Sequence, residues 1–325
     1  MLNKIKPIFI ISLPRTGSTL IQRILMGHSK ISSVAEPHFL LPFIYATKQN
    51  GTLTNYSHYG AHKGFKDVLK NLPNGEIDYY QFLNEFSVKI YSSLSNSNSI
   101  YFLDKTPRYF WIIPEIEKIF PNAKFIFLFR NPVQVFASTI STFSDNRFHK
   151  LYRFHYGLDE GFNLISKGFE KLKSKAYAIQ YEKFIENPEH YLTEILDYLD
   201  LNYESNLLSN FNKQDLKGAS VDPTGVKLYK SIDDSPLEKW KTIFNSNYRK
   251  KILNNYIDNL DNDSLLIQGY DKQKIKSEIN NLKTNGKHKL FHDILDYNRS
   301  LLIEKYKLNL LFSNKMKWAD KQFLS

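Results

Sequence analysis

Short apolar runs alternate with helix-like segments through the first two thirds of the chain, and this alternation constrains the fold most strongly. The runs are rich in β-branched and aromatic residues and are bounded by polar residues, Pro or Gly; they span residues 7–13, 99–105, 123–130 and, more weakly, 175–182. Near-continuous apolar runs are typical of strands that are buried on both faces of a parallel sheet. The sequence therefore predicts an α/β fold with a parallel sheet flanked by helices.

Helical periodicity fills the stretches between these runs. It covers residues 20–26, 79–94, 133–141, 159–172 and 183–200. The last of these helices is expected to start near Pro188. Residues 43–78 show no clean period, so we expect loops and short helices there, and residues 210–235 have the composition of a loop. From Pro236 onward the pattern is helical again.

The C-terminal part of the chain is more basic than the rest. Residues 270–325 carry 12 Lys and Arg against 6 Asp and Glu, which accounts for over half of the net charge of +11. We expect one domain over residues 1–272, with residues 273–325 as a basic helical C-terminal extension packed on the same domain. The apolar positions of this extension are expected to dock on the domain as one face of an amphipathic helix; they are Phe291, Ile294, Leu295, Leu301 and Leu302.

Composition limits the kind of protein further. A positive net charge suits nucleic acid, a membrane surface or an anionic ligand, but a chain rich in Lys throughout can also acquire it without any such partner. Cysteine is absent, which excludes disulfides and cysteine–zinc sites and fits a reducing compartment. No run approaches the ~20 apolar residues of a membrane helix, and the N-terminal run is too short for a signal peptide. We therefore expect a cytoplasmic protein without an integral membrane segment.

The stretch "ISLPRTGSTLIQRIL" joins the first apolar run to a helix through a turn suited to an anion. A helix N-terminus offers free N–H groups and the positive end of a dipole. Gly17 permits close backbone approach, Arg15 can fork onto a phosphate or sulfonate, and the hydroxyl residues Thr16, Ser18 and Thr19 can donate hydrogen bonds. The turn is neither a Walker A loop, because Ser18 replaces the lysine, nor a dinucleotide G-x-G motif. A plain turn capped by Thr16 or Ser18 is the alternative.

A second stretch, "FLFRNPVQVFAST", ends an apolar run with a cation. Arg130 lies at the predicted carboxyl end of a strand, where open α/β sheets bind ligands. Asn131 and Pro132 then open a helix, and Ser138 lies two turns into it. Arg130 and Ser138 can therefore meet one anion, although a surface arginine before a helix-starting proline has the same pattern.

Together, the two stretches resemble the cofactor signatures of sulfotransferases that use 3′-phosphoadenosine 5′-phosphosulfate (PAPS). The resemblance is to the branch that contains tyrosylprotein, carbohydrate and many bacterial sulfotransferases. It implies a P-loop-like sheet in which Arg15, Thr16, Gly17, Ser18 and Thr19 hold the 5′-phosphosulfate. It also implies that Arg130 and Ser138, eight residues apart, hold the 3′-phosphate of PAPS and of the product PAP.

Three further stretches fit this resemblance, which covers about residues 5–272. In "VAEPHF", Glu36 lies at the position of the family's catalytic glutamate, 21 residues after Arg15. In "DKTPRY", Lys105 lies where the family contacts the transferring group. In "IQYEKF", Tyr181 matches a residue that contacts the nucleotide.

Two departures from the family pattern are visible. The loop order is Thr-Gly-Ser-Thr where this branch usually has Ser-Gly-Thr-Thr, so its hydroxyls are kept. The Arg-Lys-Gly phosphate loop of the cytosolic branch has no match, and only loose candidates can replace it: Lys217, Lys227 and Lys230.

The resemblance implies an in-line sulfuryl transfer without a metal. Arg15 and Lys105 would stabilise the charge that develops on the transferring group, and Glu36 would take the proton of the acceptor. Histidine pairs at i, i+4 (His58 with His62, His288 with His292) lack the glutamate of a zinc-protease helix, so we interpret them as packed or solvated.

Two other classes remain open on the sequence alone. One is a P-loop nucleotide kinase-like enzyme, and the other is a non-catalytic protein that binds a nucleotide or nucleic acid. The acceptor of a sulfotransferase would be a hydroxyl or an amine. We favour a hydroxyl on a glycan or small molecule and expect no nucleic-acid partner.

Overall fold

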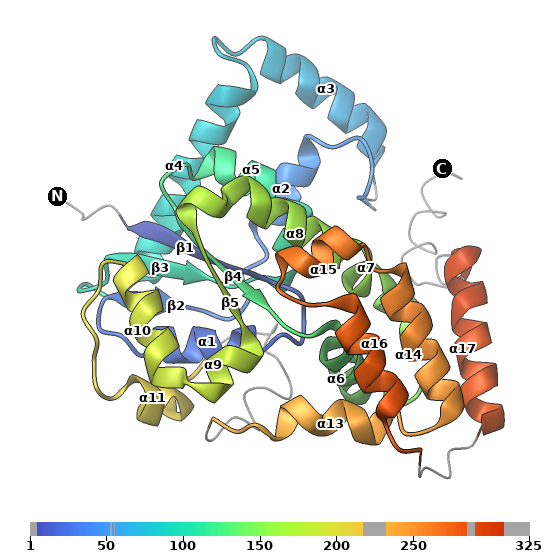
Figure 1. The fold of residues 1–325 in the computed structure, drawn as a ribbon. Helices are drawn as coiled ribbons and strands as arrows, with labels where there is room; N and C mark the ends of the chain where they lie inside the picture. Colours follow the sequence, from blue (N-terminus) through green and yellow to red (C-terminus); the bar gives the residue numbers. More distant parts are fainter. Residues whose placement is uncertain (1–4, 53, 55, 217–231, 285–289, 309–325) are drawn as a thin grey trace.

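The protein is built on a five-stranded parallel sheet (Figure 1). The computed structural model describes residues 5–52, 54, 56–216, 232–284 and 290–308. The strand order is β2-β3-β1-β4-β5, and every pairing is parallel. The strands are β1 (Lys6–Ser12), β2 (Ile31–Ser33), β3 (Tyr101–Asp104), β4 (Lys124–Phe129) and β5 (Ala176–Gln180).

Helices surround the sheet and continue beyond it. Those up to β5 are α1 (Ser18–Leu25), α2 (Leu40–Ala46), α3 (His58–Lys70), α4 (Glu76–Leu94), α5 (Ile113–Ile119), α6 (Pro132–Ser144), α7 (His155–Leu158) and α8 (Glu160–Leu172). Those after it are α9 (Tyr181–Glu186), α10 (Pro188–Tyr198), α11 (Leu207–Asn210), α13 (Ser235–Ile243), α14 (Asn247–Asn259), α15 (Asn262–Ile267), α16 (Lys272–Asn281) and α17 (Leu290–Lys305). Short 3-10 helices are η1 (Pro107–Trp111), η2 (Leu151–Arg153), η3 (Lys173–Lys175) and η4 (Phe211–Lys213).

Two hydrophobic clusters cover the two faces of the sheet. Alternate residues of β1 point to opposite faces, so Ile8 and Ile10 join one cluster while Phe9 and Ile11 join the other. The first cluster packs against α1, α9 and α10, and the second against α4, α5, α6 and α8. The central strand is therefore buried on both faces, which is why its sequence is an almost unbroken apolar run.

The structure confirms the predicted α/β class and the four predicted strands. It adds β2, whose three residues "ISS" are too short and polar to give a strand pattern. The helix predicted over residues 183–200 is split at Asn187 into α9 and α10, because Pro188 starts a new helix instead of continuing the old one. Residues 58–70 form a longer helix than we expected in that stretch.

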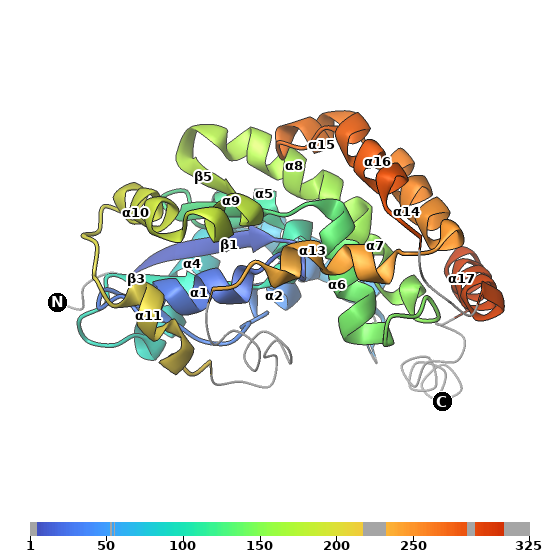
Figure 2. The same cartoon turned by 60° about the horizontal axis from the view of Figure 1, so that its bottom comes forward.

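Figure 2 shows α17 at one end of the molecule, next to α14. Ile275 and Ile279 of α16 are buried in the same cluster as the sheet residues. The expectation that the apolar positions of α17 dock on the domain is wrong: all five are exposed. The helix packs instead through Asp293, Asp296, Ser300 and the half-buried Tyr297. The division at residue 272 stays a prediction.

Candidate active site

The loop between β1 and α1 lies at the carboxyl edge of the sheet. Arg15 and Gly17 both have positive φ angles, 71° and 93°, so the chain turns sharply before the helix. Gly17 itself is the N-cap of α1, and the Thr16 hydroxyl donates to the carbonyl of Leu13 at 2.8 Å. The helix is therefore not capped by Thr16 or Ser18, which was the alternative interpretation of this turn. The first-turn N–H groups of a helix without a side-chain cap suit an anion.

The ring of Tyr181 packs directly against this loop. A Cβ atom at Gly17 would lie 2.3 Å from Tyr181 Cε2, so only glycine fits here. The same ring lies under the guanidinium of Arg130, whose Cζ is 4.4 Å from the ring centroid. Three residues that are far apart in sequence thus form one packed layer at the ends of β1, β4 and β5.

Hydrogen bonds of Arg130 connect the loop after β1 with the start of α6. Its Nη1 donates to the carbonyl of Arg15, its Nη2 to the carbonyl of Pro236, and its Nε to Gln134 Oε1, each at 3.0 Å. Arg15 Nε donates in turn to the hydroxyl of Ser138 at 3.3 Å. The cation predicted for one phosphate and the cation predicted for the sulfuryl end therefore belong to one connected network. A guanidinium has five N–H donors, so Arg130 retains two beyond these three bonds.

Glu36 and Lys105 form an ion pair beside the loop. Lys105 Nζ lies 2.6 Å from Glu36 Oε1 and 3.4 Å from the hydroxyl of Thr19 in α1. The ring of His38 lies 3.2 Å from the second oxygen, Glu36 Oε2. Burial alone would raise the pKa of Glu36, but the hydrogen bond with His38 and the charge of Lys105 outweigh it and leave that pKa below its ordinary value. Glu36 is therefore an ionised carboxylate at neutral pH.

A buried carboxylate behind this pair was missed by the sequence analysis. Asp104 accepts hydrogen bonds from the hydroxyls of Tyr91, Tyr109 and Thr106 at 2.7, 3.1 and 2.9 Å. The Thr106 oxygen also accepts from the backbone N–H of His38 at 3.4 Å, which links Asp104 to the loop that carries Glu36. Burial raises the pKa of Asp104 to about 6. Its only sequence signal is an acid at the end of an otherwise apolar strand, "YFLDK".

The assembled site is cationic and rich in hydroxyls. Arg15, Lys105 and Arg130 converge with the hydroxyl residues of the loop and with Ser138, and one carboxylate faces them. Such a site can hold a phosphate or sulfate group and stabilise negative charge that develops on it. Among the residues that the structure describes, no group of three His, Asp or Glu side chains could hold a metal ion. Lys217, Lys227 and Lys230 lie outside the described residues.

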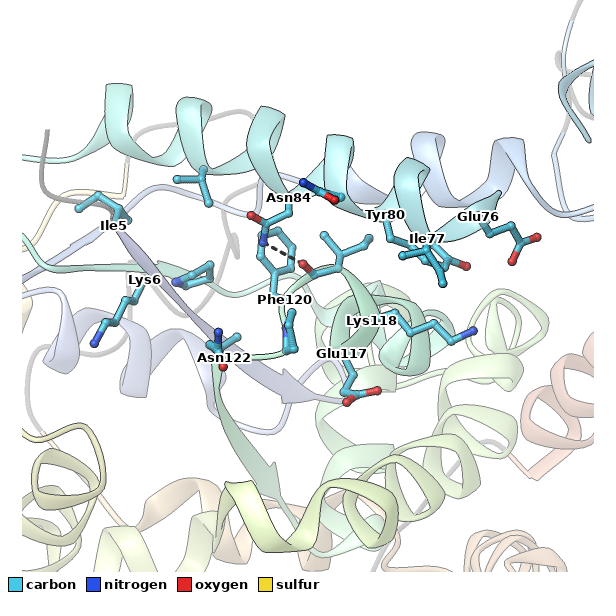
Figure 3. Close-up of a pocket in the computed structure, with 16 residues that line it drawn as sticks. Ile5, Lys6, Glu76, Ile77, Tyr80, Asn84, Glu117, Lys118, Phe120 and Asn122 are labelled. Carbon is cyan, nitrogen blue, oxygen red and sulfur yellow. Dashed lines mark hydrogen bonds between the residues drawn. The ribbon is translucent and has the colours of Figure 1, made fainter. Parts of the chain in front are cut away.

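A separate cavity of about 760 Å³ opens at the opposite edge of the sheet (Figure 3). It lies between α4 and the start of β1 and is lined mainly by apolar groups, with Tyr80 and Asn84 on one wall and Phe120 on the other. Asn84 donates to the carbonyl of Ile119 there, at 2.8 Å. Because β1 runs from this edge to the Arg15 loop, the cavity and the cationic site are about 20 Å apart.

An open parallel sheet whose first strand leads through a tight loop into a helix defines an α/β protein of the class that binds ligands at the carboxyl edge of its sheet. A family model described as "Sulfotransferase family" matches residues 7–205, and the chain belongs to that family. No helix in the described parts of the chain is both long and apolar enough to cross a membrane.

One solved structure shares the fold, and individual relatives match in sequence at low identity. A sulfotransferase domain from the Synechococcus PCC 7002 olefin synthase has 21 % identity and a TM-score of 0.51, with coverage of 83 % of this chain and 96 % of that one. A putative protein-tyrosine sulfotransferase of Caenorhabditis briggsae is 23 % identical over 262 residues, which are 75 % of this chain and 84 % of the relative. An uncharacterized protein of Aquifex aeolicus is 26 % identical over 249 residues, or 73 % of this chain, but this chain spans only 30 % of that protein.

Proposed function

We propose that this chain is a PAPS-dependent sulfotransferase that moves the sulfuryl group of PAPS to a hydroxyl acceptor. The observation that carries the proposal is the Lys105–Glu36 pair, which lies beside the Arg15–Thr19 loop at the carboxyl ends of β1 and β3. A loop for an anion would explain nucleotide binding alone. A cation and an ionised carboxylate at its edge supply what group transfer to a hydroxyl also requires.

The donor would be held at two points. The loop N–H groups, with Thr16, Ser18, Thr19 and Arg15, would bind the 5′-phosphosulfate. Arg130 and Ser138 would bind the 3′-phosphate, and the Tyr181 ring would contact the nucleotide from the adjacent layer. The 3.3 Å bond between Arg15 and Ser138 supports this division, because it sets the two proposed phosphate positions a short distance apart.

The reaction would be an in-line displacement at sulfur. The acceptor oxygen forms a bond to sulfur as its proton passes to Glu36, while the bond from sulfur to the bridging oxygen of PAPS breaks and PAP leaves with the electron pair. Lys105 and Arg15 would stabilise the charge on the peripheral and bridging oxygens. No step in this scheme needs a metal ion.

His38 would position the base and not replace it. Its ring contacts Glu36 Oε2, and its backbone is in a left-handed conformation with φ of 57°, held through Thr106 by the buried Asp104. With Lys105 on the other oxygen, Glu36 is fixed from both sides. An acceptor hydroxyl would compete with His38 for one of these oxygens.

The other classes explain less of the site. A P-loop kinase would need a lysine where Ser18 stands. A non-catalytic nucleotide-binding or nucleic-acid-binding protein would leave the Glu36–Lys105–His38 cluster without a use. The acceptor we favour is a hydroxyl on a glycan or a small molecule. We place the reaction in the cytoplasm, because a chain without cysteine fits a reducing compartment.

Binding of PAP and of ATP to the purified protein separates these classes. Calorimetric titration should give tight binding of PAP and much weaker binding of ATP, which lacks the 3′-phosphate. Transfer of radiolabelled sulfate from PAPS to a panel of glycans, phenols and alcohols then tests the chemistry. Binding of ATP in preference to PAP would contradict the proposal.

A further inference from the structure

Helix α17 is amphipathic, but the side that carries its acids faces the protein and most of its large apolar side chains face outward. Asp293, Asp296 and Ser300 are buried beneath the helix. Seven large apolar side chains of the helix and of the turn after it are 38–73 % exposed; they are Leu290, Phe291, Ile294, Leu295, Leu301, Leu302 and Tyr306. At about 3.6 residues per turn these positions fall on one continuous side of the helix. Tyr297 and Ile303 are half-buried, and Tyr297 packs against the core beside Phe148. Figure 1 shows α17 as the outermost helix at its end of the molecule.

Ion pairs explain why the helix lies this way round. Asp293 accepts two hydrogen bonds from Arg249 of α14, at 2.7 and 2.8 Å, and both side chains are almost fully buried. Asp296 accepts two from Arg147, at 2.8 and 2.9 Å. Turning the helix over would leave the Arg249 guanidinium buried without a counter-charge, and a buried unpaired charge is costly. The ion pairs of Asp293 and Asp296 therefore fix which side of the helix meets the protein, and the apolar side is left facing outward.

The outward side carries only positive charge. Every acid of α17 is turned toward the protein: Asp293 and Asp296 are paired as described, and Glu304 lies 2.9 Å from the ring of His155. The exposed ionisable side chains of the helix are His292, Arg299 and Lys305. The face that the molecule presents here is therefore apolar with basic residues along it.

We propose that this face of α17 docks the protein on an anionic membrane surface. Apolar side chains on such a helix insert at the boundary between lipid headgroups and acyl chains, while bases at its edges attract anionic headgroups. A second copy of this chain is the competing occupant. A symmetric dimer would bring two basic faces of the same sign together, so charge complementarity favours the lipid. This docking does not depend on the sulfuryl-transfer proposal.

Vesicle flotation of the full-length protein tests the docking. The protein should float with phosphatidylcholine vesicles that contain phosphatidylglycerol and much less with phosphatidylcholine alone, and added salt should weaken the binding. Leu295→Gln with Leu302→Gln should reduce partitioning by roughly tenfold or more, because two side chains leave the lipid. The matched control is Val68→Gln with Leu266→Gln, since the exposure of the four residues lies between 53 and 56 %.

The basic residues are tested separately. Arg299→Gln with Lys305→Gln should lower binding to anionic vesicles by on the order of fivefold per residue and leave phosphatidylcholine binding unchanged. Lys66→Gln with Lys70→Gln, on the exposed side of α3, is the control for loss of charge. Circular dichroism confirms that each variant is folded.

Two results would overturn the membrane proposal. One is equal flotation of the wild type and the Leu295→Gln, Leu302→Gln variant. The other is a dimer in sedimentation velocity that this variant dissociates, without any vesicle binding by the wild type, which would assign the face to a second copy.

Discussion

Lys105 and Glu36 are separated by 69 residues in the sequence, yet their side chains form a 2.6 Å ion pair at the carboxyl edge of the sheet. The Lys105 side chain is almost completely buried, whereas Glu36 retains contact with solvent. The pair keeps Glu36 ionised and holds Lys105 beside Thr19, the second residue of α1. In the proposed reaction Glu36 removes the proton of the acceptor and Lys105 stabilises the charge on the transferring group, so both roles depend on this pair.

Glu36→Gln should abolish most of the transfer activity and leave PAP binding nearly intact. Loss of a general base lowers a rate by roughly 10²–10⁴-fold, and the amide keeps the shape of the carboxylate. His38→Asn should cost far less and act mainly on acceptor binding, because His38 contacts the base and not the donor loop. Single-turnover sulfate transfer from PAPS measures both. Rapid transfer by Glu36→Gln together with an inactive His38→Asn would show that His38, and not Glu36, is the general base.

Arg130→Ala should weaken PAP binding by roughly 1.5–3 kcal/mol, the range for a hydrogen bond to a charged group. Arg130→Lys is the matched control: it keeps the charge but replaces the planar fork that reaches the carbonyls of Arg15 and Pro236 with a single ammonium group. We expect an intermediate affinity for it in calorimetric titration with PAP. Unchanged PAP affinity in Arg130→Ala would show that the 3′-phosphate is bound elsewhere.

Gly17→Ala should destabilise the loop and reduce PAP affinity together. The new Cβ would lie 2.3 Å from the Tyr181 ring, in a backbone conformation that alanine adopts only with strain of about 1–3 kcal/mol. The control is Gly64→Ala in α3, where the added Cβ meets nothing within 4 Å. That change should stabilise the protein by about 0.5–1 kcal/mol, as expected for an exposed helix position. Urea denaturation and PAP titration of both variants make the comparison, and equal behaviour would refute the packing argument.

Asp104→Asn should change how stability depends on pH. Burial raises the pKa of Asp104 from its ordinary value of 3.8 to about 6, so between these values the folded protein binds more protons than the unfolded chain. The wild type's free energy of unfolding should then fall relative to that of Asp104→Asn as pH rises from about 4 to about 7, by up to about 3 kcal/mol. Urea denaturation of both proteins across this pH range gives the difference between their free energies of unfolding. The contributions of the other titrating groups cancel in this difference, because both proteins contain them. Parallel stability curves would mean that Asp104 does not titrate there.

Local sequence determined the strands and the loop of this protein. Apolar runs of β-branched and aromatic residues predicted four of the five strands, because a strand buried on both faces needs such a run. The short strand β2 was not predicted, since three residues are too few to show a periodic pattern. The positions of Arg15, Gly17 and Arg130 followed from where the runs end.

The contacts between these residues came only from the tertiary structure. Nothing local pairs Glu36 with Lys105 or stacks Tyr181 on Gly17, because the sheet order brings separate strand ends together. The buried Asp104 was missed for the same reason, since its three hydroxyl partners lie on α4, on η1 and beside its own strand.

Helix α17 shows where sequence alone gave the wrong answer. Its amphipathic pattern was visible, and the usual rule turns the apolar side of such a helix toward the core. The side that actually packs was decided by Arg249 and Arg147, which lie on other elements and need the carboxylates of Asp293 and Asp296 as partners. Sequence thus determined that α17 has two unlike faces, and the cost of burying an unpaired charge, which depends on the tertiary structure, decided which face meets the protein.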